Sequence, residues 1–432
     1  MAALTVYEQL LLELVNRARL DPTGEAARYG ISLNNGLAAG SLTATAKQAL
    51  APNELLVSSA RAHSQWMINS DIFSHTGGGG TDPGDRMGSA GYRFTGSWTW
   101  GENIAWSGTT GTPNLLSYTN ELHRNLFLSP GHRVNILEGD FRELGTGITS
   151  GPFKSGATTY NAVMATENFA TSGASFFVTG VAITDKDGDN FYDIGEARSG
   201  ITMSLSTGGS DATGASGGFA AKFAGGTVGV TFSGGNLASN VSVTIAAGYQ
   251  NAKVDLVDSN EILSSVSTTL GAGAVRLGLL GVASIRGTGN DVSNVIYGNK
   301  GGNALDGRGG NDYLLGGAGR DILTGGSGAD KFDFNTISES GKTATLRDQI
   351  TDFLRGTDKL DLSSIDARTA LTGNQAFTWI STQAFHRKAG ELHTVRSGAN
   401  LVVEGDVNGD AVADFQIQLN NITALAAGDF VL

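Results

Sequence analysis

A stretch of glycine and aspartate between residues 287 and 332 has the residue types and the spacing of a cation site. Its acidic position falls every nine residues, and an apolar residue follows two positions later in the last four units, at Leu305, Leu314, Leu323 and Phe332. Aspartate supplies charged oxygen ligands, and glycine permits turns in which backbone carbonyls approach an ion. A flexible Gly-rich linker would not keep the two positions in phase. The period therefore predicts a parallel β-helix whose turns bind Ca²⁺.

A second acidic segment has the ligand spacing of an EF-hand loop. Oxygen-bearing side chains stand at loop positions 1, 3, 5, 9 and 12 and a carbonyl at position 7; these residues are Asp185, Asp187, Asp189, Asp193 and Glu196, with the carbonyl of Phe191. Asn190 replaces the usual glycine of position 6, and asparagine also tolerates the left-handed conformation. Because the flanking segments have the pattern of strands, we expect a calcium loop within a β domain. The alternative is an acidic, solvated turn.

Catalysis is the less favoured interpretation of this sequence. None of the six histidines, at positions 63, 75, 123, 132, 386 and 393, begins a His-Glu-x-x-His zinc motif. We also expect no Gly-x-Ser-x-Gly nucleophile elbow. The chain has no cysteine, so thiol catalysis, zinc-thiolate sites and disulfides are excluded.

Helices and strands must position these groups. Thr5 and Glu8 have the spacing of a capping box ahead of an apolar helical run that Asp21-Pro22 ends. Further helices are expected over residues 53–70 and 113–128 and after Ser129-Pro130, with a strand over 160–167. Composition then turns to Gly, Ser, Thr and Ala, with short strands expected at 176–183, 201–206, 228–232 and 241–245.

Charge and hydropathy limit the partners. The 432-residue chain has a formal net charge of -12, from 41 acidic and 29 basic residues, which argues against nucleic acid and favours cations. Its first residues lack the basic and apolar regions of a secretory signal peptide, and no apolar stretch is long enough for a transmembrane segment. We expect a soluble chain that would need another export route.

Residues 285–432 resemble secreted Gram-negative proteins. The Gly/Asp repeat resembles the repeats-in-toxin (RTX) family, and three later segments look like the C-terminal region of serralysin-type metalloproteases: residues 348–353, 356–362 and 405–415. The resemblance implies a calcium-binding β-roll and an uncleaved signal for a type I exporter. Low cytosolic calcium would keep the repeat loose until export, after which Ca²⁺ binding would couple to folding.

The repeat and this resemblance together assign a set of calcium ligands. In chain order they are Asp291, Asn303, Gly307, Gly309, Asp312, Gly316, Asp321, Gly325, Asp330, Asp348, Asp352, Asp358 and Asp361. Asn303 departs from the aspartate of the motif. The unit that contains Asp291 begins at Gly287. Its acidic position lies twelve rather than nine residues before Asn303, so these first two units are the least regular.

The segment 5–170 resembles the bacterial branch of the CAP superfamily, named for cysteine-rich secretory, antigen 5 and pathogenesis-related proteins. Four shorter stretches carry the resemblance in order and spacing, at positions 11–19, 62–77, 101–105 and 129–147. The resemblance implies an α-β-α sandwich whose cleft contains His75, Glu102 and His132. A second cleft glutamate of eukaryotic members is missing, and Ser129 is the nearest match.

Two imidazoles and a carboxylate in one cleft have two uses. They could hold Zn²⁺ with an open position, or they could form local hydrogen bonds without metal. His132 would occupy the third position of its helix, where the helix dipole lowers the imidazole pKa and favours the ligating form. Of the other histidines, we expect His63 to be packed and His123 to be solvated.

The sequence therefore predicts a multidomain protein. A CAP-like α-β-α sandwich would span residues 1–172, a β-sandwich with the EF-hand-like loop residues 175–284, and a calcium-binding parallel β-roll with a type I secretion signal residues 285–432. The predicted function is that of a secreted or cell-surface calcium-binding protein that binds an extracellular ligand in the CAP cleft. The alternatives are a secreted metal-dependent hydrolase using His75, Glu102 and His132, and a structural surface or adhesion protein.

Overall fold

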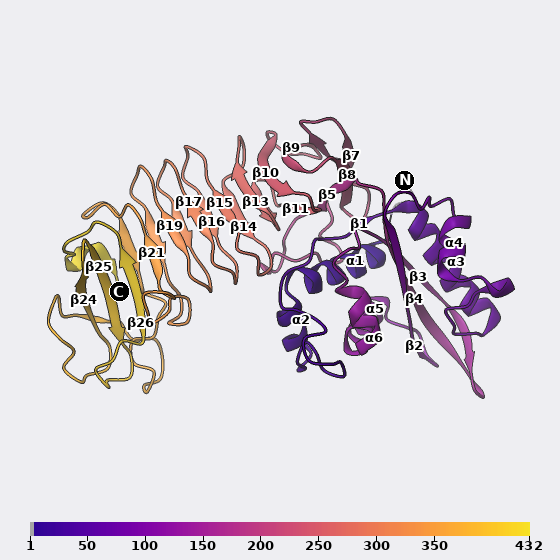
Figure 1. Ribbon diagram of the computed structural model, residues 1–432, viewed down its shortest axis with the longest axis horizontal. Coiled ribbons are helices and arrows are strands. Elements are labelled where there is room, and N and C mark those ends of the chain that lie inside the picture. The colour runs from indigo at the N-terminus through magenta and orange to yellow at the C-terminus, as the bar shows by residue number, and fades with distance from the viewer. Residues whose placement is uncertain (1–3) are drawn as a thin grey trace. The chain divides into compact units, whose positions relative to one another are not determined.

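The computed structural model describes residues 4–432 (Figure 1), and the chain divides into two compact units. The first unit contains Met1–Asn240 and Ala247–Ser259, and the second contains Val241–Ala246 and Asn260–Leu432. Within residues 4–432, no helix combines the length and the hydropathy needed to cross a bilayer.

The N-terminal part of the first unit, up to Ser172, forms three layers, with helices on both faces of a four-stranded sheet (Figure 1). The sheet has the order β1-β3-β4-β2, formed by Ala51–Pro52, Glu143–Ser155, Thr158–Ser172 and Trp98–Thr109. One face packs against α3 (Glu54–Ser70) and α4 (Pro83–Ser89). The other packs against α1 (Val6–Leu20), α2 (Pro22–Arg28), α5 (Leu115–Leu128) and α6 (Pro130–Ile136). The mixed α and β structure expected for this part of the chain is confirmed.

Helix starts lie where the sequence predicts them. Thr5 and Glu8 form the capping box of α1, and the Asn53 side chain accepts hydrogen bonds from the first backbone N–H groups of α3. Ser129 precedes Pro130 at the start of α6, although its side chain makes no capping hydrogen bond.

Two glycines of β3 allow α3 to lie directly against the sheet. A Cβ atom on Gly145 would lie 2.1 Å from the carbonyl carbon of Leu56, and one on Gly147 would lie 2.3 Å from the backbone nitrogen of Arg61. The Ser64 hydroxyl then donates to the Gly147 carbonyl at 2.9 Å. The helix that leads into the predicted cleft is thus fixed to the strand through backbone contact.

Residues 176–240 and 247–257 of the first unit form short strands. β5 (Phe176–Ile183) pairs in parallel with β11 (Ala252–Val257) and antiparallel with β8 (Gly218–Phe223). β6 (Ile201–Leu205) pairs antiparallel with β7 (Ser210–Ala212) and β9 (Gly226–Gly234). Met203, Val230 and Phe232 are fully buried, as the alternating pattern of these strands requires.

Buried polar contacts join these strands to the three-layer part. The ammonium of Lys253 binds the carboxylates of Glu13 and Asp255, each at 2.6 Å, and all three side chains are at most 8% exposed. The Asn251 amide donates to the carbonyls of Ala49 at 2.8 Å and Arg142 at 2.7 Å. Separating the strands from the three-layer part would leave these buried charges without partners, which is costly. The contacts therefore hold the strands and the three-layer part together as one unit.

In the second unit, successive strands of three or four residues alternate between two sheets in which they pair in parallel. One sheet contains β13 (Ser267–Leu270), β15 (Arg286–Thr288), β17 (Ala304–Asp306), β19 (Ile322–Thr324) and β21 (Asp348–Ile350), and β10 (Val241–Gly248) pairs with β13. The other contains β12 (Glu261–Ser264), β14 (Arg276–Leu279), β16 (Val295–Tyr297), β18 (Tyr313–Leu315), β20 (Lys331–Asp333) and β22 (Lys359–Asp361). Gly287 pairs with Leu305, and Leu305 with Leu323, so each full turn of the stack contains two repeats.

The apolar residue of each repeat lies in the core of this unit. Leu314, Leu323 and Phe332 are 0% exposed and Leu305 is 1% exposed. The nine-residue phase predicted from the sequence is therefore confirmed as one short strand per repeat.

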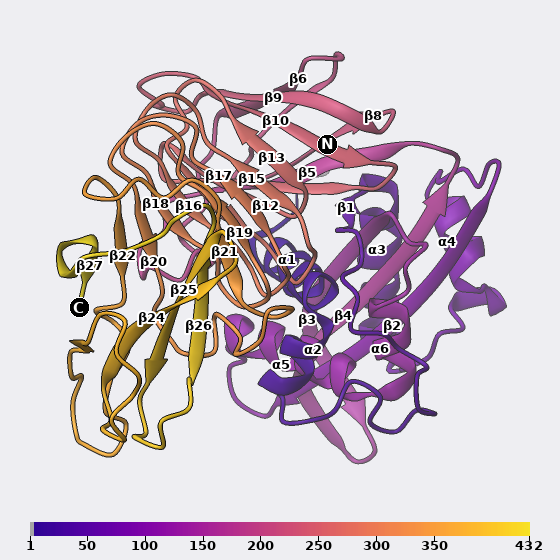
Figure 2. The ribbon, with the colours of Figure 1, turned by 60° about the vertical axis from the view of Figure 1, so that its left-hand side comes forward.

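The second unit ends in a different pattern. β24 (Glu391–Ser397), β25 (Asn400–Asp406) and β26 (Phe415–Leu419) lie side by side as antiparallel strands (Figure 2). β23 (Thr378–Trp379) pairs with β24, β26 pairs in parallel with β21, and β27 (Phe430–Val431) pairs in parallel with β22 after a short 3-10 turn at Ala427–Asp429. The last strand of the chain thus continues one of the two parallel sheets.

Gly147→Ala should destabilise the first unit by about 1–3 kcal/mol, because the added methyl group overlaps the α3 backbone. Gly88→Ala is the matched control, since a Cβ atom there meets no heavy atom within 4 Å and alanine favours the helix. Urea unfolding of both variants would measure the difference. Equal free energies of unfolding would show that α3 does not pack as closely as described.

Candidate functional site

Aspartates of the second unit form two columns along the stacked turns. In one, the Oδ1 atom of Asp312 accepts a hydrogen bond from the backbone nitrogen of Asn294 at 2.7 Å, Asp330 accepts from Asp312 at 2.9 Å, and Asp358 accepts from Asp330 at 3.0 Å. In the other, Asp321 accepts from Asn303 at 2.6 Å and Asp348 accepts from Asp321 at 2.8 Å. Each carboxylate therefore links two successive turns.

The second carboxylate oxygen of four aspartates is buried without a hydrogen-bond partner in the described residues. These are the Oδ2 atoms of Asp312, Asp321, Asp330 and Asp348. Three of them lie against a glycine at the start of the same loop: a Cβ atom on Gly307, Gly316 or Gly325 would come within 2.5 Å of the Oδ2 of Asp312, Asp321 or Asp330 respectively. Buried polar atoms normally have partners. Unpaired carboxylate oxygens beside backbone carbonyls are the ligand set that Ca²⁺ prefers.

Burial raises the pKa of these carboxyl groups. The pKa is about 7 for Asp312 and Asp321 and about 8 for Asp348. It is also raised for Asp330 and Asp358, again mainly by burial. The nearby Arg320 guanidinium lowers the pKa of Asp348, but burial outweighs it. A bound metal ion would therefore have to displace protons from this unit.

Asn303 occupies a column position but has its partners within the protein. Its Oδ1 atom accepts from the backbone nitrogen of Asn299 at 2.7 Å, and its amide donates to the Ile285 carbonyl at 3.2 Å. Asn294 holds the equivalent place in the other column and was missed in the sequence. It precedes Asp312 by two repeat lengths, and this spacing is the signal that could have found it.

The structure does not bring the remaining predicted ligands into the columns. Asp361 binds the Lys331 ammonium at 2.8 Å. Asp352 accepts backbone hydrogen bonds from Gly325 and Gly326, and Asp291 is exposed. Gly309 forms an isolated bridge with Ser327. The calcium assignment of these positions stays a prediction.

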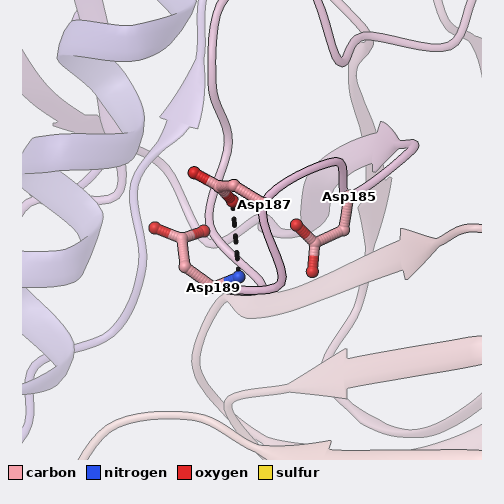
Figure 3. A group of neighbouring side chains, drawn as sticks. All are labelled: Asp185, Asp187 and Asp189. Carbon is pink, nitrogen blue, oxygen red and sulfur yellow. Dashed lines mark hydrogen bonds between the residues drawn. The ribbon is translucent and has the colours of Figure 1, made fainter.

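The acidic loop of residues 185–196 is closed by its own side chains. Asp185 accepts from the backbone nitrogens of Gly188 at 2.9 Å and Asn190 at 3.2 Å, and Asp187 accepts from Asp189 at 3.4 Å (Figure 3). Asn190 has φ 57°, as expected of the residue that replaces glycine. Ligand oxygens of Asp185, Asp187 and Asp189 lie within 4.8 Å of one another, the one such acidic or histidine cluster found in residues 4–432.

This loop also touches helix α1. The guanidinium of Arg17 lies 4.9 Å from the centre of the Phe191 ring, a cation–π contact. Arg17 in turn binds Glu25 at 2.7 Å, and Glu25 accepts from His123 at 2.9 Å. The backbone carbonyl predicted as a calcium ligand therefore belongs to a residue packed on the three-layer part.

A second loop has the same backbone pattern and was not assigned to calcium in the sequence analysis. Asp406 accepts from the backbone nitrogens of Gly409 at 2.6 Å and Ala411 at 2.9 Å, as Asp185 does from positions three and five residues on. Ala411 has φ 67°, matching the left-handed Asn190. The Lys342 ammonium binds Asp414 of this loop at 3.1 Å. The alternating oxygen residues at 406, 408 and 410 are the signal that could have revealed the likeness.

In the three-layer part, Glu102 lies at the centre of the predicted cleft. Its side chain is 1% exposed, its Oε1 atom lies 2.9 Å from His75 Nδ1, and its Oε2 atom lies 2.6 Å from Arg86 Nη2. His63 Nε2 lies 3.9 Å from Oε1. The structure therefore brings His75 and Glu102 together, and it adds Arg86 and His63, which the sequence analysis did not place in the cleft.

His132 completes the predicted trio from α6. Its ring centre lies 6.4 Å from that of His75, and burial, followed by the nearby His75, lowers the pKa of His132. His63 is buried as predicted, with Nε2 3.0 Å from the Ser74 carbonyl oxygen. The zinc hypothesis gains no support here, because both oxygens of Glu102 already have partners.

One expectation about a histidine was wrong, and one sequence pattern was missed. His123 is 0% exposed and hydrogen-bonded to Glu25, although its charged sequence neighbours suggested a solvated side chain. Residues 214–218, Gly-Ala-Ser-Gly-Gly, do match the letters of the Gly-x-Ser-x-Gly pattern. They connect β7 to β8, however, whereas a nucleophile elbow joins a strand to a helix.

Comparisons with known families cover most of the chain. The model of the family described as "Peptidase M10 serralysin C terminal" matches residues 184–432, and that of the "Cysteine-rich secretory protein family", CAP, matches residues 12–169. The search of curated proteins found no match.

Solved structures resemble separate parts of the chain. An extracellular SCP-domain protein from Bacillus anthracis is 26% identical with a TM-score of 0.22, and the match covers 28% of this chain and 34% of that one. The AlgE6R2 subunit of the Azotobacter vinelandii mannuronan C5-epimerase is 31% identical with a TM-score of 0.24, covering 35% and 92%. The chain thus spans about a third of the length of the SCP-domain protein.

In calcium-free buffer, the second unit should lose stability as the pH rises from about 4 to about 8. The aspartate pKa is 3.8 when unperturbed but about 7 to 8 for Asp312, Asp321 and Asp348, so the folded unit holds protons that the unfolded chain releases. Each such proton contributes about 1.4 kcal/mol per pH unit.

Calorimetry at several pH values would measure this slope. Asp321→Asn removes one of the groups and should make the decline shallower than in wild type. A wild-type slope equal to that of Asp321→Asn would contradict the raised pKa of Asp321.

Proposed function

Because the chain belongs to the family described as the serralysin C terminal of peptidase M10, we propose that it is a secreted calcium-binding protein. Its last third would fold as a β-roll around Ca²⁺ outside the cell, and its CAP domain would carry the extracellular function. Three parts are proposed: the CAP domain, a β-sandwich with the calcium loop at residues 185–196, and the β-roll.

One observation carries the calcium proposal. Four aspartates in consecutive turns each keep a buried oxygen that has no hydrogen-bond partner within residues 4–432. For three of them, the adjacent glycine has no room for a Cβ atom. A divalent cation between turns would satisfy these oxygens and neutralise carboxylates that are otherwise forced towards the protonated state.

Folding that requires Ca²⁺ would be compatible with export of the unfolded chain, which is the proposed route. With little free Ca²⁺ in the cytosol, the charged columns would oppose folding, and a loose chain suits passage through a type I exporter. Calcium outside would then stabilise the folded state by mass action. The exporter and the C-terminal signal are proposed from the family and from the RTX-like repeat.

The cleft is proposed to bind a ligand rather than to hydrolyse one. His75 is half-exposed, and its Nδ1 atom is held by Glu102, so its Nε2 atom can contact a ligand. His132 lies on α6, and its ring centre is 6.4 Å from that of His75. Within residues 4–432, no serine or threonine hydroxyl is hydrogen-bonded to either histidine ring, so a serine–histidine pair gains no support. A metal-dependent hydrolase gains none either, because both carboxylate oxygens of Glu102 already have partners.

Removing one column carboxylate should weaken the response to calcium. We expect Asp321→Asn to lower the Tm of the full chain in saturating Ca²⁺ by about 5 °C or more, through the loss of one bound ion. In a chelator, its Tm should equal or exceed that of the wild type, because a buried acid has been removed. Calorimetry with and without Ca²⁺ would measure both values.

Asp140→Asn is the matched control, since it removes the same charge from an exposed position of the first unit. It should leave the calcium response unchanged. If Asp321→Asn and Asp140→Asn respond alike to calcium, the columns do not bind Ca²⁺.

A further inference from the structure

The carboxylate of Glu102 is fully engaged by groups from three different segments. Its Oε1 atom pairs with His75 Nδ1 at 2.9 Å, and its Oε2 atom accepts from Arg86 Nη2 at 2.6 Å. The amide of Asn168, in the orientation that satisfies its own neighbours, also donates to Oε2 at 3.2 Å. Because the Glu102 side chain is only 1% exposed, water does not compete for these oxygens.

Arg86 is itself held in place. It lies on α4, and its Nη1 atom donates to the carbonyls of His75 and Thr81, each at 2.9 Å. Its side chain is 12% exposed. The guanidinium therefore ties Glu102 to both ends of the glycine-rich segment between His75 and Thr81, which includes the 3-10 turn Gly78–Gly80.

This ion pair has a consequence for metal binding. Two histidines and one glutamate would give a divalent metal three protein ligands and an open position. To act as the third ligand, Glu102 would have to leave a short, buried, charge-assisted hydrogen bond. Arg86 also places a positive charge beside the site and cancels the negative charge that would attract a cation.

We propose that Arg86 is a specificity-determining residue that keeps divalent metal out of the cleft by engaging Glu102. The cleft of this chain then presents the His75 and His132 imidazoles to a metal-free ligand. This inference goes beyond the proposed function, because the calcium columns lie in the other unit and can be tested separately.

Zinc binding by the full chain tests the proposal. The protein is held in saturating Ca²⁺, so that the oxygen-rich sites are filled, and Zn²⁺ is added with equilibrium dialysis and metal analysis as the readout. Wild type should bind no zinc that depends on His132. Arg86→Gln should gain about one equivalent, at least about tenfold tighter than wild type, and His132→Ala in the Arg86→Gln background should abolish the gain.

Three further variants separate charge from structure. Arg86→Lys keeps the positive charge and should gain no zinc. Arg93→Gln removes the same charge from an exposed position of the same domain and should behave as wild type. Arg86→Met keeps the aliphatic packing of the side chain, so it should gain zinc even if Arg86→Gln loosens the glycine-rich segment.

Two results would overturn the proposal. One is a zinc equivalent in wild type that disappears in His132→Ala. The other is the absence of a His132-dependent gain in both Arg86→Gln and Arg86→Met. Neither result bears on calcium binding, which the Tm of Asp321→Asn reports.

Discussion

The stability of the second unit depends on the charge state and the partners of its buried carboxylates. A short strand of three residues buries one apolar side chain per repeat, such as Leu314 or Leu323, so the core between the sheets is thin. The turns on either side carry aspartates whose second oxygen has no partner. An unpaired polar atom in a buried site costs more than a hydrogen bond contributes. Within residues 4–432, four of these aspartates, Asp312, Asp321, Asp330 and Asp348, keep such an oxygen, and buried carboxylate oxygens beside backbone carbonyls match the ligand preferences of Ca²⁺.

In the first unit, three buried glutamates are paired with arginine side chains. Glu8 binds Arg61, Glu25 binds Arg17, and Glu102 binds Arg86, each as a buried or partly buried ion pair. Burial alone would raise the pKa of Glu25, yet hydrogen bonds from His123 and Arg17 lower it to about 2. Glu167 differs from these three: it is buried and accepts a hydrogen bond from the Asn103 amide, and burial raises its pKa to about 7. The carboxylates of these pairs in the first unit are thus balanced by side chains, whereas burial leaves the pKa of Asp312, Asp321 and Asp348 in the second unit raised to about 7 to 8.

The sequence predicted most where a pattern repeats along the chain. The nine-residue period placed the strands and the buried leucines correctly, because each repeat contacts mainly its neighbours and sees the same environment. The capping box of α1 was found for a similar reason, since a cap depends on three or four consecutive residues. β2 and β3 were not predicted, because their glycines lower strand propensity. In β3, Gly145 and Gly147 are present so that α3 can approach, a requirement set by a helix far away in sequence.

The state of the cleft was harder to predict, because it too depends on residues that lie far apart in the sequence. Its histidines could be identified by resemblance, but their state depends on Arg86, which lies 16 residues before Glu102 and on another element. Nothing in the local sequence of Arg86 separates it from a solvated surface arginine. Likewise, charged neighbours made His123 look exposed, while Glu25, 98 residues away, holds it in the core. Pairing of charges across a fold decides whether a carboxylate can bind a metal, and it is the property that residue types and spacing alone leave undetermined.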